Sequence, residues 1–393
     1  MPDDPKSIAR RPQFPASTSR PMVTPLYPSV AYASPDATAL DDQYEGRAQG
    51  YTYAREGHPN ADVLVQKING LEGAHAGIIT GSGMAAIGAV YLALLKTGDH
   101  VIAGDQLYGR NLRLLTEDLP RHGITVSFCD VTDADQVSAA MTPATRLVVI
   151  ETIANPTLRL ADVPRIAAIT RAAGITLMVD NTFSTPAMIR PLDLGADIVM
   201  HSVTKLLAGH SDATLGYLGT HDAKMMAAIT TACVTWGLTP SPFDCWLAER
   251  GLQSFDLRFE RAQSNAKALA DTIADLPGVT QVLYPSRADH PDRTLAQSLY
   301  GHGGGTMLSF ALDGDRDTVD RFLRAASDIP FAPTLGDIST TISHPATSSH
   351  RALSQSARLE LGIPEAFFRI SVGVEDIELL RQEFTTAIAK AMA

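Results

Sequence analysis

The sequence has few cysteines and no excess of basic residues. Its 3 cysteines, at positions 129, 233 and 245, are too few and too scattered for a disulfide framework or a zinc cluster, and they fit a reducing compartment. Asp and Glu (43) outnumber Lys and Arg (32), which gives a formal net charge of −11 at pH 7. A protein that binds a phosphate backbone needs the opposite balance. We therefore expect a small-molecule ligand and no nucleic-acid partner.

Long apolar segments are also missing. No window reaches about 18 consecutive apolar residues, so we expect no transmembrane helix and no membrane partner. Residues 1–21 carry charges without the apolar stretch of a secretory signal, which favours a cytoplasmic protein. The composition, with 45% hydrophobic and 19% charged residues, is that of a folded globular chain. A chain of 393 residues exceeds what one core usually holds, so two packed domains are expected.

The order of the segments predicts an α/β protein in three parts. Residues 1–56 are rich in Pro, Ser, Ala and Asp and lack a sustained period, so we expect an extended arm that reaches a neighbouring subunit. In residues 57–250, β-branched segments alternate with helical ones, which predicts a mostly parallel sheet with helices on both faces. Residues 251–393 are expected to form a smaller α+β domain, with a strand pair near 281–285 and 305–312. The strands expected in the large sheet are 76–80, 101–105, 124–130, 146–152, 175–180, 197–203 and 213–220.

The glycine-rich segment GSGMAAIG, residues 81–88, lies between an expected strand and an expected helix. Backbone N–H groups at such a helix start can bind an anion. GSGMAA is also a near-match to the dinucleotide-binding fingerprint, with Asp99 or Asp105 near the expected acidic position, so a nicotinamide-dependent oxidoreductase is one alternative. Ser82 can equally be a helix N-cap beside glycines that close packing requires.

Two expected strands deliver an acid and a lysine to the same place. Segment 175–180 ends in Asp180, and segment 197–203 leads into Ser202, Thr204 and Lys205. In a doubly wound sheet both ends lie at the carboxyl edge, where ligands bind. A lysine there can form a Schiff base with an aldehyde cofactor, an aspartate can keep a pyridine nitrogen protonated, and two hydroxyls with a helix N-terminus can hold a phosphate. Taken alone, Asp180 also suits a turn cap and Lys205 a solvated surface.

A set of motifs in this order resembles the Cys/Met-metabolism family of pyridoxal-phosphate enzymes. The motifs are YAREGHPN, GSGMAAI, LYG, ETIANP, VDNTFSTP, HSVTKLLAGHSD, SPFDCWLAERGL, SHPATSSH and FRISVGVED, and the resemblance runs from Pro25 to the last helix. The family includes cystathionine γ-synthase, cystathionine γ- and β-lyases, methionine γ-lyase and the O-acylhomoserine sulfhydrylases. The resemblance implies pyridoxal 5′-phosphate (PLP) as cofactor, fold type I with a seven-stranded sheet, a large cofactor-binding domain and a small substrate-binding domain. It also implies a homotetramer, a dimer of dimers with active sites shared across each dimer.

The resemblance assigns roles to individual residues. Lys205 would carry the cofactor as a Schiff base and remove the substrate Cα proton, and Asp180 would pair with the pyridine nitrogen. Tyr108 would stack on the ring and act as acid or base near the leaving group. The cofactor phosphate site would contain Ser82, Gly83, Met84, Ser202 and Thr204, with Tyr53 and Arg55 coming from a neighbouring subunit. The substrate carboxylate would be held by Asn155 and Arg369, with Thr334 beside them.

Several positions depart from the family pattern and bear on the substrate. Ser339 stands where cystathionine-handling members commonly have a glutamate facing the distal ammonium, and Thr334 replaces a serine. Arg110 stands where methionine γ-lyases typically have a cysteine, and with Arg113 it suits a substrate with a distal anion. We predict a carbon–sulfur lyase that acts by γ-elimination on a sulfur amino acid, with β-elimination as a variant. The alternatives are a γ-replacement transferase that uses an O-acylhomoserine and a catalytically silent member of the family.

Overall fold

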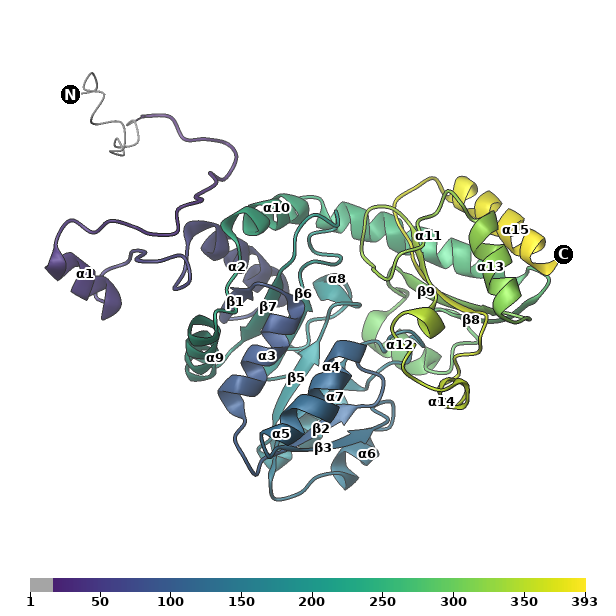
Figure 1. Ribbon diagram of the computed structural model, residues 1–393, viewed down its shortest axis with the longest axis horizontal. Helices are drawn as coiled ribbons and strands as arrows, with labels where there is room; N and C mark the ends of the chain where they lie inside the picture. Colours follow the sequence, from purple (N-terminus) through teal and green to yellow (C-terminus); the bar gives the residue numbers. More distant parts are fainter. Residues whose placement is uncertain (1–16) are drawn as a thin grey trace.

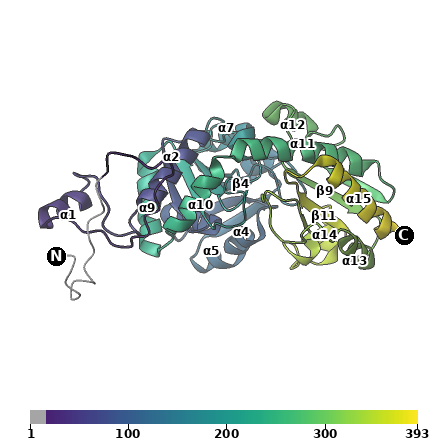
Figure 2. The ribbon, with the colours of Figure 1, turned by 90° about the horizontal axis from the view of Figure 1, so that it is seen from above.

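The computed structural model describes residues 17–393 and contains two packed bodies, the larger of which carries the arm (Figure 1). Residues 1–16 of the predicted 1–56 arm lie outside the described residues. The described part of the arm is extended apart from α1 (Ala37–Tyr44), none of whose residues is buried. Trp246 Nε1 donates to the carbonyl oxygen of Thr24 at 2.8 Å and ties the arm to the larger body. Figures 1 and 2 show α1 at the end of the molecule away from the C-terminus.

A seven-stranded sheet forms the centre of the larger body. Its strands are β1 (Ala76–Thr80), β2 (His100–Gly104), β3 (Thr125–Cys129), β4 (Thr145–Glu151), β5 (Thr176–Asp180), β6 (Ile198–Ser202) and β7 (Gly216–Thr220). Their order is β1-β7-β6-β5-β4-β2-β3, and the pairs from β6 to β3 are parallel, whereas β7 runs antiparallel to both β1 and β6. The predicted mostly parallel sheet of seven strands is therefore confirmed.

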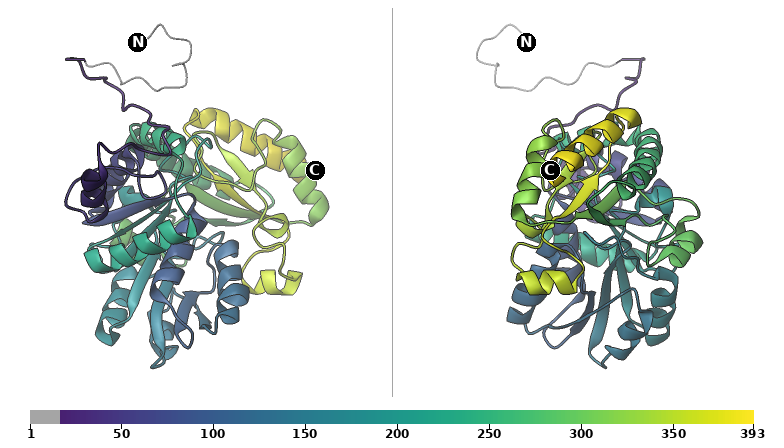
Figure 3. Two further views of the ribbon diagram at one scale, coloured as in Figure 1. Left: turned by 60° about the vertical axis from the view of Figure 1, so that its left-hand side comes forward. Right: turned by 90° about the vertical axis from the view of Figure 1, so that its right-hand side faces the viewer.

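Helices cover both faces of this sheet, as predicted (Figure 3). They are α2 (Pro59–Glu72), α3 (Gly83–Leu94), α4 (Gly109–Arg113), the π-helical turn η2 (Leu114–Asp118), α5 (Leu119–Arg121), α6 (Ala134–Ala139), α7 (Val163–Ala173), α8 (Thr185–Met188), α9 (Ala223–Trp236) and α10 (Pro242–Leu252). Alternate strand residues face opposite layers: in β5, Met178 packs in the core with α3 and α9, whereas Leu177 and Val179 pack in the core with α7. The α7 helix begins at the N-cap Asp162 and ends at Gly174, whose φ of +66° suits a glycine. No helix within residues 17–393 is both long and apolar enough to cross a membrane.

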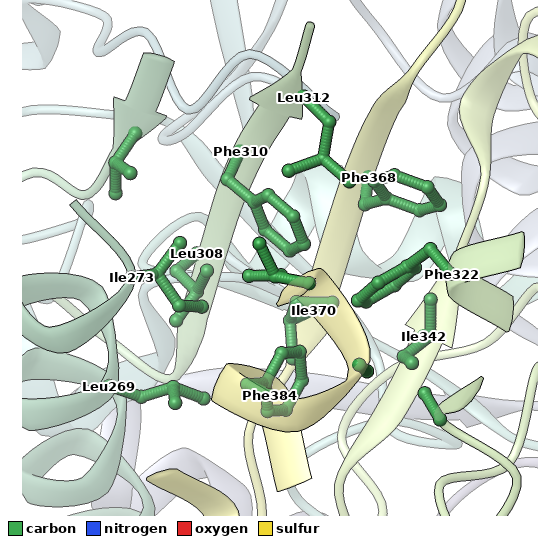
Figure 4. Close-up of a cluster of buried hydrophobic side chains, with 14 of the residues drawn as sticks. Leu269, Ile273, Leu308, Phe310, Leu312, Phe322, Ile342, Phe368, Ile370 and Phe384 are labelled. Atoms are coloured by element: carbon green, nitrogen blue, oxygen red, sulfur yellow. The ribbon is translucent and has the colours of Figure 1, made fainter. Parts of the chain in front are cut away.

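The smaller body holds a four-stranded antiparallel sheet in the order β10-β11-β9-β8. Its elements are α11 (Phe255–Ala274), β8 (Val279–Leu283), α12 (Arg293–Tyr300), β9 (Met307–Leu312), α13 (Arg316–Ala325), β10 (Thr341–Ser343), the 3-10 turn η3 (Pro345–Thr347), α14 (Gln355–Glu360), β11 (Phe367–Ser371) and α15 (Ile377–Met392). The predicted strand pair corresponds to β8 and β9, and the structure adds β10 and β11. Figure 4 shows the core, where Phe310 of β9 stacks on Phe368 of β11 with 5.3 Å between ring centroids. Phe322 of α13 and Phe384 of α15 pack on this pair, and each buried ring contributes about 1.5–3 kcal/mol.

The two bodies meet along α11 and at a loop over the end of β6. Phe255 and Phe259 of α11 belong to the core of the larger body, while Ala266–Ile273 contribute to the core of the smaller one. The division at residue 250 stays a prediction, because α11 serves both cores. Loop 334–337 of the smaller body passes against Leu206: Gly336 has a φ of +82°, and a Cβ there would lie 2.5 Å from the Leu206 nitrogen. Only glycine allows this close crossing.

Candidate active site

The carboxyl ends of four neighbouring strands bring four of the predicted site residues to one edge of the large sheet. Tyr108 follows β2, Asn155 follows β4, Asp180 ends β5, and Lys205 follows β6. These strands are consecutive and parallel in the sheet, so they end at the same edge. The topology explains why residues far apart in the sequence share one site.

Lys205 is half-buried directly after β6. Its Nζ donates to Thr334 Oγ1 at 3.3 Å, so the loop from the smaller body contacts the amine. Burial lowers the pKa of Lys205, and the charge of Arg369 lowers it further. A lowered pKa increases the neutral fraction of the amine, which is the form that attacks a carbonyl carbon or accepts a proton.

Asp180 occupies the last position of β5, and its Oδ1 accepts a hydrogen bond from the Thr182 backbone at 2.9 Å. This contact is the turn cap that the sequence analysis named as an alternative role for Asp180. Burial raises the pKa of Asp180, whereas the Thr182 hydrogen bonds and the nearby His201 lower it. A cationic ring nitrogen at this carboxylate would favour its ionised form. Asp180 therefore fits a pyridinium partner.

Glu151 is a site residue that the sequence predictions missed. It ends β4 and is the register partner of Asp180. Its Oε1 accepts a hydrogen bond from the Tyr108 backbone nitrogen at 2.6 Å, while the Tyr108 side chain is 44% exposed and free to contact a ligand. Burial, and then the charge of Asp180, raise the pKa of Glu151 well above its usual range. The sequence did carry a signal for Glu151: it is an acidic residue near the end of an expected strand, and that strand pairs with the strand of Asp180.

The start of α3 forms a cradle at the same sheet edge. Gly83 is buried, and a Cβ there would lie 2.9 Å from the Ser202 Cβ, so glycine is required. Gly83 and Met84 lie in the first helical turn, whose N–H groups have no intrahelical acceptor and suit a phosphate. Ser82 Oγ accepts from Ala85, as a helix N-cap does. In the segment after β6, Thr204 Oγ1 both donates to and accepts from the backbone of Leu215.

Arg369 of β11 supplies a buried cation, 6% exposed. Its Nη1 donates to Asn155 Oδ1 at 2.8 Å and its Nη2 to the Thr334 carbonyl oxygen at 2.7 Å. Its Nε is buried and has no hydrogen-bond partner among the described residues. Burial lowers the pKa of Arg369 to about 10, so it stays charged at neutral pH. An unpaired donor on a buried cation fits a ligand carboxylate.

The predicted determinants of the distal substrate group lie on the surface. Arg110 and Arg113 are exposed on α4, and Arg113 Nε lies 3.2 Å from Glu117 Oε2 of the adjoining η2. Ser339 is exposed, and its backbone N–H donates to Asp337 Oδ1 at 2.9 Å. The contacts of these three residues are local, and their role toward a substrate stays a prediction.

The predicted contribution of the arm to the cofactor site also stays a prediction. Tyr53 is 43% exposed and forms an isolated bridge with Ala31. The Arg55 guanidinium lies 5.4 Å from the centroid of the Tyr53 ring, and its Nη1 lies 3.5 Å from Glu56 Oε1. Both side chains are therefore accessible on the arm. Among the described residues, their side-chain contacts are with each other and with Glu56.

Comparisons with known proteins agree with this chemistry. The sequence model of the family described as Cys/Met metabolism PLP-dependent enzyme matches residues 7–389. The chain is 38% identical over 364 residues to a cystathionine gamma-lyase of Bacillus subtilis, covering 93% of both chains, and 38% identical to the cystathionine beta-lyase MetC of that organism, covering 86% of both. The structure of cystathionine gamma synthase from Xanthomonas oryzae pv. oryzae in complex with cystathionine superposes with a TM-score of 0.89 at 34% identity, covering 94% of this chain and 93% of the other.

Proposed function

Since this chain belongs to the Cys/Met-metabolism family of PLP-dependent enzymes, we propose that it is a carbon–sulfur lyase acting by γ-elimination on a sulfur amino acid. With cystathionine and water, the reaction would release cysteine, 2-oxobutanoate and ammonia. The observation that supports the proposal is that Lys205 and Arg369 both contact Thr334, so that an amine with a lowered pKa lies near a buried cation whose Nε has no partner among the described residues. Belonging to this family excludes the nicotinamide oxidoreductase that the glycine-rich segment left open.

The proposed cofactor contacts follow from the fit of the residues. Lys205 would bind the aldehyde carbon of PLP, Asp180 its ring nitrogen, and Tyr108 its ring face. The first turn of α3 at Gly83 and Met84 would bind the phosphate, together with Ser82, Ser202 and Thr204. When bound, PLP supplies an electron sink that stabilises negative charge at the substrate Cα.

The remaining steps belong to side chains of the protein. Arg369 and Asn155 would fix the substrate carboxylate, with the Arg369 Nε as the free donor. Lys205 Nζ, whose pKa is lowered by burial and by Arg369, would accept the Cα proton. The Tyr108 hydroxyl would donate a proton to the leaving sulfur. With the substrate carboxylate held by Arg369 and Asn155, the Cα–H bond of the substrate would point toward one base, Lys205 Nζ.

A γ-replacement transferase is the second candidate, supported by the likeness to a cystathionine gamma synthase, and Arg110 and Arg113 are compatible with it. Both guanidinium groups are exposed on α4, directly after Tyr108, where they suit the distal carboxylate of an O-succinylhomoserine. They suit the distal carboxylate of cystathionine equally. Ser339 stands where the resemblance leads us to expect a glutamate in cystathionine-handling members. A neutral hydroxyl at this position argues against tight recognition of a distal ammonium. Because this counts equally against cystathionine as substrate and as product, we place elimination first on the 38% identity to a cystathionine gamma-lyase, against 34% to the cystathionine gamma synthase.

The two candidates are separated by the fate of O-succinylhomoserine with and without a thiol. We expect 2-oxobutanoate from this substrate alone, and little change in its yield when L-cysteine is added. Formation of cystathionine at the expense of 2-oxobutanoate would instead establish the transferase. An Arg113→Ala variant should lose activity on O-succinylhomoserine and on cystathionine while keeping it on methionine. Undiminished turnover of both anionic substrates would exclude Arg113 from substrate recognition.

We also propose that the enzyme works in the cytoplasm as a homotetramer whose active sites are shared within each dimer. The support is the arm, whose α1 lies at the far end of the larger body (Figure 2). Tyr53 and Arg55 are exposed on this arm, and within residues 17–393 their side-chain contacts are to each other and to Glu56. A mixed dimer of a Tyr53→Phe, Arg55→Ala protomer with a Lys205→Ala protomer should regain activity at one site. Failure to regain activity, with dimers shown by light scattering, would refute the sharing.

A further inference from the structure

A hydrogen bond joins the loop of Tyr108 to the strand that lies beside Asp180. Glu151 ends β4, and its Oε1 accepts from the Tyr108 backbone nitrogen at 2.6 Å. Tyr108 is the first residue of the turn that leads into α4, and its own side chain provides no cap for that helix. The backbone N–H groups of Asn111 and Leu112 donate to the Tyr108 carbonyl oxygen, and the carboxyl of Glu151 adds a side-chain contact that holds the Tyr108 N–H at the start of this turn.

Glu151 also shares its place in the sheet with a second acid. Glu151 and Asp180 are register partners in parallel strands, so their side chains leave the same face at the same sheet edge. Two carboxylates partly removed from water at adjacent positions cannot both ionise at low cost. Asp180 has the better support for a charge, because Thr182 donates to it and His201 lies nearby. Consistently, the pKa of Glu151 is raised well above its usual range, first by burial and then by Asp180.

We propose that Glu151 is a positioning residue that acts as a neutral carboxylic acid: its carbonyl oxygen holds the Tyr108 backbone in place, and its proton leaves Asp180 as the single anion at this edge. The carbonyl oxygen of a protonated carboxyl can accept a backbone N–H. The Tyr108 hydrogen bond by itself lowers the pKa of Glu151, but burial and the charge of Asp180 outweigh it. An effect of Glu151 on PLP binding rests on the proposed function, since it requires the Tyr108 ring to contact the cofactor. The hydrogen bond from the Tyr108 backbone to Glu151 does not depend on the proposed function.

Two substitutions distinguish a neutral acid from a carboxylate. Glu151→Gln keeps the size and the accepting oxygen but has no charge, whereas Glu151→Ala removes the acceptor. Asp197→Ala is the matched control, because Asp197 Oδ2 accepts the Leu177 backbone N–H at 2.8 Å at the opposite end of β5. The Asp197→Ala substitution thus removes one equivalent hydrogen bond from the same sheet and leaves the Glu151–Tyr108 hydrogen bond in place.

The first readout is hydrogen exchange in the cofactor-free protein, measured by mass spectrometry on a peptide covering residues 105–112. We expect exchange at Tyr108 to be roughly ten-fold faster in Glu151→Ala, the effect of losing one hydrogen bond, and unchanged in Glu151→Gln and Asp197→Ala. The second readout is the PLP dissociation constant, expected to be roughly ten-fold higher in Glu151→Ala and within about two-fold of wild type in Glu151→Gln.

Each outcome decides the proposal. If Glu151→Gln behaves like Glu151→Ala in both readouts, the negative charge is what matters and the neutral-acid role is wrong. If Glu151→Ala leaves exchange at Tyr108 unchanged while its overall unfolding matches wild type, the hold on the turn is wrong. If the wild-type protein fails to bind PLP, the proposed function fails, yet the exchange comparison still reports on Glu151.

Discussion

Replacing Arg369 by lysine probes the proposed carboxylate site. The two Nη atoms donate to Asn155 Oδ1 at 2.8 Å and to the Thr334 carbonyl oxygen at 2.7 Å, while the buried Nε has no partner among the described residues. A single ammonium cannot keep both contacts and also meet a substrate carboxylate. A hydrogen bond to a charged group contributes about 1.5–3 kcal/mol, so the loss of one should raise KM roughly 10- to 100-fold.

The assay is steady-state release of 2-oxo acid from L-cystathionine, with kcat and KM determined separately. Because the carboxylate is bound in the ground state and in the transition state alike, we expect KM to rise more than kcat falls. Arg381→Lys is the control, since Arg381 pairs with Glu378 on the exposed face of α15. The reasoning is refuted if Arg369→Lys leaves KM unchanged, or if it weakens binding of the decarboxylated amine as much as that of the amino acid.

Three further predictions concern stability and the cofactor. Phe310→Ala should cost about 3–5 kcal/mol in the free energy of unfolding measured with urea, against less than about 0.5 kcal/mol for the half-exposed Leu379→Ala. Burial lowers the pKa of His350 from 6.5 to about 4, so the folded protein holds it neutral while the unfolded chain takes up a proton below pH 6.5. Stability should therefore fall as pH drops from 6.5 towards 4, and His350→Gln should remove about 2 kcal/mol of the loss between pH 7 and pH 5; equal losses in both proteins would contradict this. Asp180→Asn should raise the PLP dissociation constant at least about ten-fold, as loss of a charged partner does, whereas Asp197→Asn should not.

The large sheet was predictable because each of its strands carries its own local signal. Segment 175–180 is a β-branched run that ends in an acid, and 163–173 is bounded by an aspartate and a glycine that cap a helix. Such signals depend on a few neighbouring residues. The strands β10 and β11 escaped prediction because β10 has only three residues and pairs with a strand 26 residues further along the chain, so only the tertiary fold defines it.

The meeting of Asp180 and Lys205 at one sheet edge was predictable from the sequence, but the contacts between the residues there were not. The ends of β5 and β6 place Asp180 and Lys205 at one edge, which topology alone requires. The contacts of Thr334 with both Lys205 and Arg369 depend on how the smaller body docks on the larger one, and no local pattern encodes that. Glu151 likewise contacts a backbone nitrogen, which leaves no mark on the sequence of the Tyr108 loop.

The product released from L-cystathionine tests the central proposal most directly. Purified, PLP-loaded protein and its Lys205→Ala variant would be incubated with L-cystathionine, and the 2-oxo acids would be identified and timed by mass spectrometry. We expect wild type to release 2-oxobutanoate together with cysteine and ammonia, and Lys205→Ala to release neither 2-oxo acid at a measurable rate. Pyruvate from wild type would show β-cleavage instead, and absence of both 2-oxo acids from wild type would contradict the lyase.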